Sequence, residues 1–200
     1  MAIAYLAGSI PFAFLAGKAK GIDLRQHGSG NLGATNAIRV LGPRIGGLVY
    51  LGDTLKGMLP ALILPMYISA SRPGIWAIIF GVAAIVGHVF PIFLMGQGGG
   101  KGVATAGGVF FGLAWKATLV ALAAFVVVVA ITRYVSAGSL AAATVLPISV
   151  LFFRGAYDPL FAISAAVSLF VIWMHRANIS RLANGTESKI GTRSKEKTGT

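Results

Sequence analysis

The chain has 200 residues, of which 56% are hydrophobic and 11% are charged. A soluble domain of this length needs more charge to cover its surface, so the composition excludes a soluble protein and indicates one membrane-embedded domain. The net charge of +12 does not indicate nucleic acid as a partner, because the basic residues lie between and after apolar segments, where the positive-inside rule and anionic lipid headgroups explain them.

Apolar segments long enough to cross a bilayer follow one another along the chain, since a span needs about 20 residues. The sequence predicts spans at residues 2–17, 45–68, 73–95, 135–153 and 156–175. The first segment has no basic start and no convincing cleavage site, so we interpret it as a short membrane helix rather than a removed signal. The apolar stretch 103–131 is too long for one comfortable span, and Lys116 interrupts it beside Trp115.

The distribution of basic residues sets the expected orientation. The first polar segment, residues 18–44, carries five basic residues against Asp23, and the tail from Arg176 carries six against two glutamates. The positive-inside rule places both in the cytoplasm, which requires a split of 103–131 near Trp115. We therefore expect an all-α integral membrane protein of about seven segments, at least one of them short or broken, with the N-terminus outside and the C-terminus cytoplasmic. Residues 1–188 are expected to form one transmembrane domain, and 189–200 a disordered basic tail.

The first polar segment contains "GSGNLGATNAIR" at residues 28–39. Gly28, Gly30 and Gly33 match the dinucleotide fingerprint G-x-G-x-x-G, and Asp53 follows Gly33 by 20 residues. The fingerprint requires a preceding strand and a βαβ unit, which a membrane helix cannot supply, so we reject it. The glycines still allow successive backbone N–H groups to converge on one anion, and a helix that begins near Ala34 would point its N-terminus at that anion.

Side chains in this segment add to the predicted anion site. The neutral donors are Ser29, Asn31, Thr35 and Asn36, and Arg39 offers a planar fork suited to phosphate. The alternative interpretation is a flexible turn with capping residues.

The second polar segment, "GQGGGKGVATAGG" at residues 96–108, places Lys101 among glycines with Thr105 behind it. It is not a Walker A loop, because Met95 stands where glycine is required and Gly102 follows the lysine in place of serine or threonine. A lysine in a donor-rich backbone beside a membrane is typical of phosphate binding. The alternative is a hinge between helices with one positive-inside lysine.

The third polar segment, "HRANISRLANGTE" at residues 175–187, contains His175, Asn178 and Arg181. If the segment is helical, these three side chains share roughly one face. The alternative is a terminal helix whose arginines extend to the membrane surface.

Other polar residues are interpreted as structural or inert. Asp53 and Lys56 are expected to pair, because an unpaired charge in a membrane is costly, and His88 is expected to be a hydrogen-bonded structural histidine. His27 lies near Ser29 without a third orienting group, which argues against a serine nucleophile. The chain has no cysteine, so thioester chemistry is excluded. Metal-ligand spacing is also absent, and no metal site is predicted.

Five stretches along nearly the whole chain resemble the acyl-phosphate:glycerol-3-phosphate acyltransferases of bacterial membranes. They are "GSIPFAFL" (8–15), "DLRQHGSGNLGATNAIRVLG" (23–42), "GHVFPIFL" (87–94), "GGKGVATAGG" (99–108) and "NISRLANGTE" (178–187). The resemblance implies transfer of a fatty acyl group from acyl phosphate to the 1-hydroxyl of glycerol 3-phosphate, which yields lysophosphatidate and inorganic phosphate without a cofactor. It also implies a multi-pass protein of the bacterial inner membrane whose active site faces the cytoplasm.

The resemblance and the residue chemistry together give a hypothesis for the site. The residues expected to act in catalysis are Ser29, Lys101 and His175. The residues expected to bind the two substrates are Gly28, Gly30, Asn31, Gly33, Thr35, Asn36, Arg39, Gly99, Gly100, Gly102, Thr105 and Asn178. The acyl phosphate is assigned to Ser29, Gly30, Asn31, Thr35, Asn36 and Lys101, and glycerol 3-phosphate to Arg39, His175 and Asn178, with Lys101 near both. The proton of the attacking hydroxyl passes either to the leaving phosphate or to His175.

The sequence departs from the family at two places. Gly96 and Gln97 replace a phenylalanine–lysine pair before the glycines, and Met174 replaces a basic residue before His175. Both departures bear on phosphate contact rather than on the reaction.

Three rival functions remain to be weighed. The acyl-CoA-dependent glycerolipid acyltransferases need an aspartate five positions after a histidine, whereas the three histidines here are followed by Leu32, Phe93 and Ser180. A transporter of phosphorylated solutes suits glycine-broken helices, but the polar segments are expected on one side and no inverted repeat is visible. A structural or partner-binding membrane protein would tolerate changes at Ser29 or Lys101.

Overall fold

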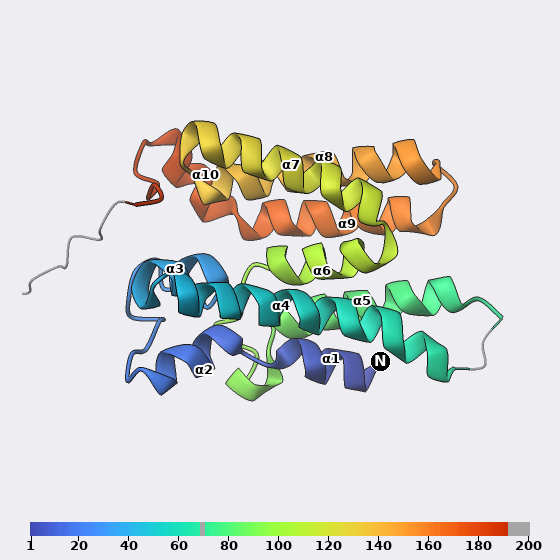
Figure 1. Ribbon diagram of the computed structural model, residues 1–200, viewed down its shortest axis with the longest axis horizontal. Coiled ribbons are helices and arrows are strands. Elements are labelled where there is room, and N and C mark those ends of the chain that lie inside the picture. Colours follow the sequence, from blue (N-terminus) through green and yellow to red (C-terminus); the bar gives the residue numbers. More distant parts are fainter. Residues whose placement is uncertain (69–70, 192–200) are drawn as a thin grey trace, which may run out of the picture.

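The computed structural model describes residues 1–68 and 71–191, and within these ranges it contains helices and no strand (Figure 1). The α-helices are α1 (Ala2–Ser9), α2 (Phe12–Ala19), α3 (Ala34–Leu41), α4 (Pro43–Ile63), α5 (Pro73–Val89), α6 (Val103–Leu113), α7 (Trp115–Thr132), α8 (Val135–Arg154), α9 (Pro159–Met174) and α10 (Arg176–Ala183). Two short 3₁₀ helices, η1 (Leu64–Tyr67) and η2 (Ile92–Leu94), extend α4 and α5.

Five helical segments of the described chain are long and apolar enough to cross a membrane: Ala2–Ala19, Pro43–Tyr67, Pro73–Leu94, Trp115–Thr132 and Val135–Arg154. The pair α9 and α10, bent by 57°, supplies a sixth, and α6 is a shorter apolar helix. These segments confirm the predicted all-α membrane fold with short and broken helices. The orientation of the termini stays a prediction.

Two interruptions of the apolar segments can be located, the first unexpected and the second predicted. The first span breaks between α1 and α2 at Ile10 and Pro11, because proline has no backbone N–H to continue the helical ladder. The long apolar stretch splits at Ala114, whose φ of −149° and ψ of 59° are not helical, so α6 ends there and α7 begins beside it. The predicted split near Trp115 is therefore confirmed.

Small residues let the central helices approach closely. A methyl group at Gly57 of α4 would overlap the backbone oxygen of Thr105 in α6, and one at Gly108 of α6 would overlap the backbone oxygen of Thr54. On the other side of the bundle, a methyl at Gly8 of α1 would overlap the backbone of Ala84 in α5. Within a membrane the hydrophobic effect does not drive helices together as it does in water, so close packing of this kind stabilises the helix contacts.

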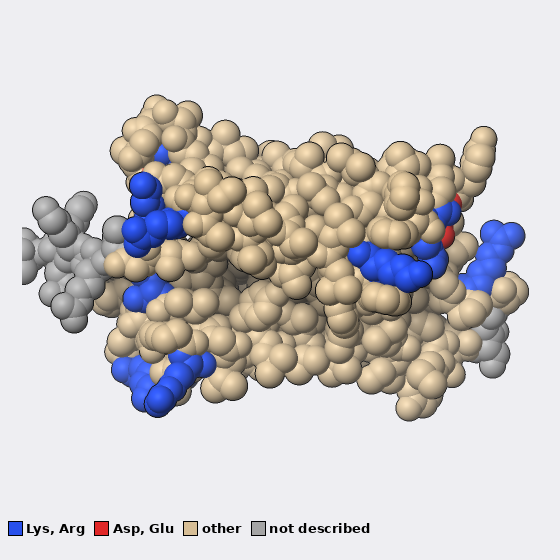
Figure 2. All heavy atoms as spheres, turned by 45° about the horizontal axis from the view of Figure 1, so that its top comes forward, with Lys and Arg blue, Asp and Glu red and all other residues tan. Residues whose placement is uncertain are grey.

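The polar segments collect at one end of the elongated bundle. Figure 1 shows α3 and α10 at the same end, where the described chain also finishes, whereas α1 begins nearer the other end. On the face seen in Figure 2, lysines and arginines gather toward both ends and leave a stretch without charged side chains between them. That distribution is typical of a protein whose middle lies in lipid and whose ends meet water.

The expected tail is only partly described. Residues 192–200 lie outside the described residues. Ile190, however, donates its N–H to the backbone oxygen of Arg133 at 2.9 Å and accepts from the Arg133 guanidinium at 2.7 Å. These two hydrogen bonds tie residue 190 to the end of α7, and the domain boundary at 188 stays a prediction.

Candidate active site

The loop between α2 and α3 is folded around Asn36. The buried amide of Asn36 accepts the backbone N–H of Ser29 at 2.9 Å and donates to the backbone oxygens of Leu24 at 3.1 Å and His27 at 3.0 Å. Gly28, with φ of 63°, takes a left-handed conformation, and a methyl there would overlap the Asn36 side chain. Asn36 therefore holds the loop in shape, while the Ser29 side chain remains exposed above it.

We expect Asn36→Asp to weaken substrate binding by roughly 30-fold, because a carboxylate of the same size cannot donate to the two backbone oxygens, a loss of about 2 kcal/mol. The measurement is KM for each substrate. Gln26→Glu, the same chemical change at an exposed residue of the same loop, is the matched control and should leave KM within about twofold. An unchanged KM in the Asn36 variant would contradict the positioning role.

The helix that follows the loop begins where the sequence predicts. Gly33 is the N-cap, and α3 starts at Ala34. Thr35 is exposed in its first turn, and Arg39 is half-buried in its last turn. Gly33 and Asn31 are also half-buried at the start of this helix, so Asn31 and Thr35 lie at its N-terminus, whereas Arg39 lies in its last turn.

The second polar segment brings Lys101 to the third. Gly102, with φ of 84°, ends the glycine run in a left-handed conformation and precedes α6. The half-buried Lys101 ammonium donates to the side-chain oxygen of Asn178 on α10. Gly98 of the same loop lies near Arg25 and Leu32, because a methyl there would stand 3.6 Å from each of these side chains. The second segment thus touches both of the others.

The Glu187 carboxylate organises the third polar segment. Its Oε1 accepts from Asn178 Nδ2 at 2.7 Å and from the Ser136 hydroxyl of α8 at 2.8 Å, and its Oε2 accepts from Arg181 Nε at 2.6 Å. Asn178 is therefore held between a carboxylate and the Lys101 ammonium, which fixes its amide orientation. Ser136 lies within an apolar helix with no motif to mark it, and Glu187, the one acidic residue of the third polar segment, was not among the predicted site residues.

His175 lies buried at the bend between α9 and α10. Its Nδ1 lies 2.8 Å from the backbone oxygen of Val171, which can only accept, so Nδ1 carries the proton. In the neutral ring Nε2 then keeps a free lone pair. Asn178 and Arg181 meet at Glu187, as their spacing on one helix face predicts, whereas the His175 ring is bonded back to α9.

Electrostatics join the three segments into one site. The pKa of Lys101 is lowered from 10.5 to about 8, first by burial and then by the guanidinium groups of Arg181 and Arg39, against the opposing effect of the Glu187 carboxylate. Burial acts to raise the pKa of Glu187, but the hydrogen bonds from Asn178, Ser136 and Arg181 outweigh it and leave that pKa lowered. An excess of positive charge therefore remains at Lys101, where an anionic ligand would relieve it.

Three other predicted residues are placed differently. Thr105 is fully buried where α6 packs on α4, and its hydroxyl has no hydrogen-bond partner within the described chain. Gly99 and Gly100 lie against the end of α5. The space beside Gly99 is filled by the backbone of Val89, and the space beside Gly100 by the His88 ring. Substrate contact by these three residues stays a prediction.

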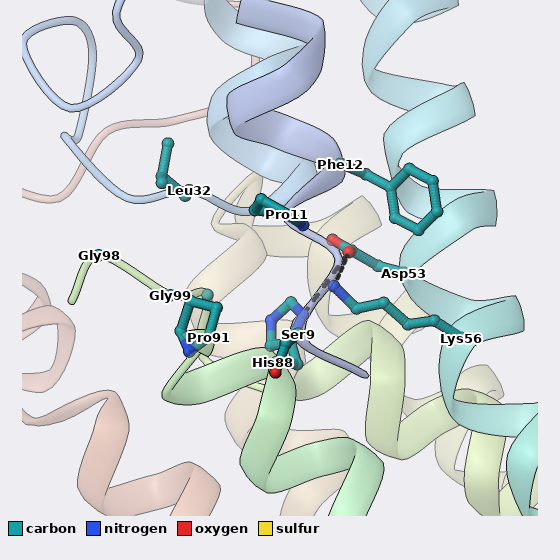
Figure 3. A pocket seen from close by; sticks show the side chains of 11 residues that line it. Ser9, Pro11, Phe12, Leu32, Asp53, Lys56, His88, Pro91, Gly98 and Gly99 are labelled. Carbon is teal, nitrogen blue, oxygen red and sulfur yellow. Dashed lines mark ion pairs between the residues drawn. The ribbon is translucent and has the colours of Figure 1, made fainter. Parts of the chain in front are cut away.

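The buried charges behind the glycines pair as predicted, with one correction. Lys56 Nζ lies 2.7 Å from Asp53 Oδ1, and both side chains are buried. His88 does not form the expected hydrogen bond through Nδ1: this atom lies 3.6 Å from Asp53 Oδ1 and has no partner within the described chain. The position of the ring accounts for this distance, because its Nε2 edge packs against Gly100 while its Nδ1 edge faces Asp53 of α4 (Figure 3).

Comparisons with known proteins identify the family of this chain. The family model described as glycerol-3-phosphate acyltransferase matches residues 1–185. The chain belongs to this family. A glycerol-3-phosphate acyltransferase of Trichlorobacter lovleyi is 49% identical over 187 residues, which cover 94% of each chain. One of Geobacillus kaustophilus is 46% identical over 94% of this chain and 93% of its own.

Solved structures show that the family's fold is also shared. The glycerol 3-phosphate form of PlsY (YgiH), an integral membrane glycerol 3-phosphate acyltransferase, matches with a TM-score of 0.86 and 39% identity over 95% of this chain and 93% of that one. The lysophosphatidic acid form matches with a TM-score of 0.83 and 38% identity, covering 94% and 92%. The resemblance drawn from the sequence motifs of this acyltransferase family is therefore confirmed.

Proposed function

We propose that the protein transfers a fatty acyl group from an acyl phosphate to the 1-hydroxyl of glycerol 3-phosphate, giving lysophosphatidate and inorganic phosphate. The observation that carries the proposal is the meeting of Lys101 with Asn178, beside Arg39, Arg181 and the glycine-rich loop, in a chain of this family. Both substrates carry phosphate, which matches the excess of cationic and neutral donors at one end of the bundle. That end faces the cytoplasm of a bacterial inner membrane in this proposal, because it holds the basic segments.

The proposed reaction needs no covalent enzyme intermediate. The hydroxyl oxygen attacks the acyl carbon, the bond between that carbon and the phosphate oxygen breaks, and inorganic phosphate leaves. The proton of the attacking hydroxyl passes to the leaving phosphate or to the free Nε2 of His175. Lys101 and the backbone N–H groups of the first polar segment hold the phosphoryl group, Ser29 lies beside them, and Arg39, His175 and Asn178 orient glycerol 3-phosphate. Positioning and charge stabilisation supply the rate.

The experiment that tests this function is acyl transfer by the purified protein in lipid with labelled glycerol 3-phosphate. Palmitoyl phosphate and palmitoyl-CoA are offered separately, and we expect labelled lysophosphatidate from the acyl phosphate alone. Product from palmitoyl-CoA would overturn the donor assignment. Product from neither donor, together with uptake of glycerol 3-phosphate into sealed vesicles, would replace the proposal with transport.

The lowered pKa of Lys101 predicts how activity depends on pH. The ammonium is charged below about pH 8 and neutral above it, so kcat/KM should fall up to tenfold per pH unit above about 8, because this ratio reports groups of the free enzyme. The phosphate substrates stay dianionic there, since the second pKa of a phosphate monoester is about 6. Lys101→Arg, which keeps its charge, should lose this alkaline fall in whatever activity it retains. A profile that is flat from pH 7 to 10 in the wild type would contradict the prediction.

A further inference from the structure

A buried charged cluster lies directly behind the glycine-rich loop. Asp53 and Lys56 of α4 and His88 of α5 are only 2%, 6% and 5% exposed. They line a small pocket whose wall includes the loop backbone of Gly98, Gly99 and Gly100 (Figure 3). None of the three side chains has a role in the proposed reaction, so their place beside the substrate loop needs another explanation.

The cluster ties the loop to two helices and a helix break. Lys56 Nζ bonds to Asp53 at 2.7 Å and to the backbone oxygen of Ile10 at 2.8 Å, where α1 ends and α2 has yet to begin. Asp53 also faces the His88 ring, with 3.6 Å between Oδ1 and Nδ1. Figure 3 shows the Asp53 carboxylate facing both Lys56 and His88.

The other edge of the His88 ring supports the loop. A methyl group at Gly100 would overlap His88 Nε2, and a methyl at Gly99 would overlap the backbone oxygen of Val89. The glycine backbone therefore rests directly on the histidine ring and on the end of α5. Lys101 is the next residue. The position of the loop backbone against the His88 ring therefore sets where the Lys101 ammonium lies relative to Asn178.

Helix packing alone does not require these charges. Replacing a buried ion pair by apolar residues of similar volume is often neutral or stabilising, and α4 already packs on α6 through glycines. We propose that His88, which packs between Asp53 and the glycine-rich loop, is a positioning residue that holds the loop of residues 98–100 and through it Lys101. This inference rests on the proposed function for its kinetic readout.

The test is a double-mutant cycle between Gly100 and His88. Gly100→Ala should lower kcat/KM at least tenfold, because its methyl group and the ring cannot share the same space. His88→Ala alone should lower it less, and the double variant should be at least fivefold more active than Gly100→Ala. Phe80→Leu, a loss of volume on the same helix at a residue 4% exposed, is the matched control: it should lower thermal stability but neither change KM nor rescue Gly100→Ala.

A second readout separates this inference from the proposed function. Hydrogen–deuterium exchange of residues 96–103 should become faster in His88→Ala than in Phe80→Leu at equal loss of thermal midpoint. If the wild type shows no acyl transfer, the proposed function fails and the exchange result alone decides the inference. Multiplicative losses in the cycle, or equal exchange in the two variants, would overturn the positioning role.

Discussion

Lys101→Met is expected to lower kcat/KM about 10²- to 10³-fold, the usual loss when one preorganised charge-stabilising group is removed. Methionine keeps an unbranched side chain of similar length but removes the ammonium that bonds Asn178. Asn178 still donates to Glu187 at 2.7 Å and Glu187 still pairs with Arg181, so the third polar segment should remain folded. The loss should therefore fall on turnover rather than on stability.

The matched control for this prediction is Lys116→Met. Lys116 lies at the start of α7, near the end of the bundle opposite α3 and α10 (Figure 1), and its ammonium stands over the Trp115 ring. Its replacement should leave kcat/KM within about twofold. The assay uses both purified proteins in the same lipid, with thermal midpoints recorded beside the rates. A Lys101→Met protein with wild-type turnover would sink the assignment of Lys101 to the phosphate site.

Local patterns predicted the helices and several of the site residues. Apolar run lengths and basic loops indicated the split that the structure places at Ala114, and the glycine–polar pattern predicted the start of α3 at Ala34. The three-residue spacing of Asn178 and Arg181 predicted that they share one helix face, where both donate to Glu187. These signals succeed because they depend on neighbours within one or two helical turns.

Contacts between distant segments were beyond that reasoning. Lys101 meets Asn178 across 77 positions, and Ser136 reaches Glu187 across 51, and nothing in hydropathy or motif spacing specifies which loops meet. The amide of Asn36 was assigned to a ligand because it lies in a donor-rich loop, yet it bonds the backbone of that loop. The chemistry of a residue type suggests what it can bind, and only packing decides whether its atoms are available.

Asp53→Asn is expected to destabilise the protein by about 3–5 kcal/mol, because it leaves the Lys56 ammonium buried without its counter-charge. For a chain of this size the loss corresponds to a fall in thermal midpoint on the order of 10 °C. Lys56→Met alone leaves Asp53 unpaired and should cost a similar amount. The double variant should recover most of the stability of the wild type, since neither charge then remains to be compensated.

Arg154→Met supplies the matched control for this pair. Arg154 and Asp158 also pair a cation with an aspartate, at 2.8 Å, but their side chains are 47% and 21% exposed. Because solvent screens such a pair, its loss should cost less than about 1 kcal/mol. Thermal midpoints of all variants in one detergent check the prediction. If the losses of Asp53→Asn and Lys56→Met simply add in the double variant, the two charges do not compensate each other and the buried pair is not what stabilises this part of the bundle.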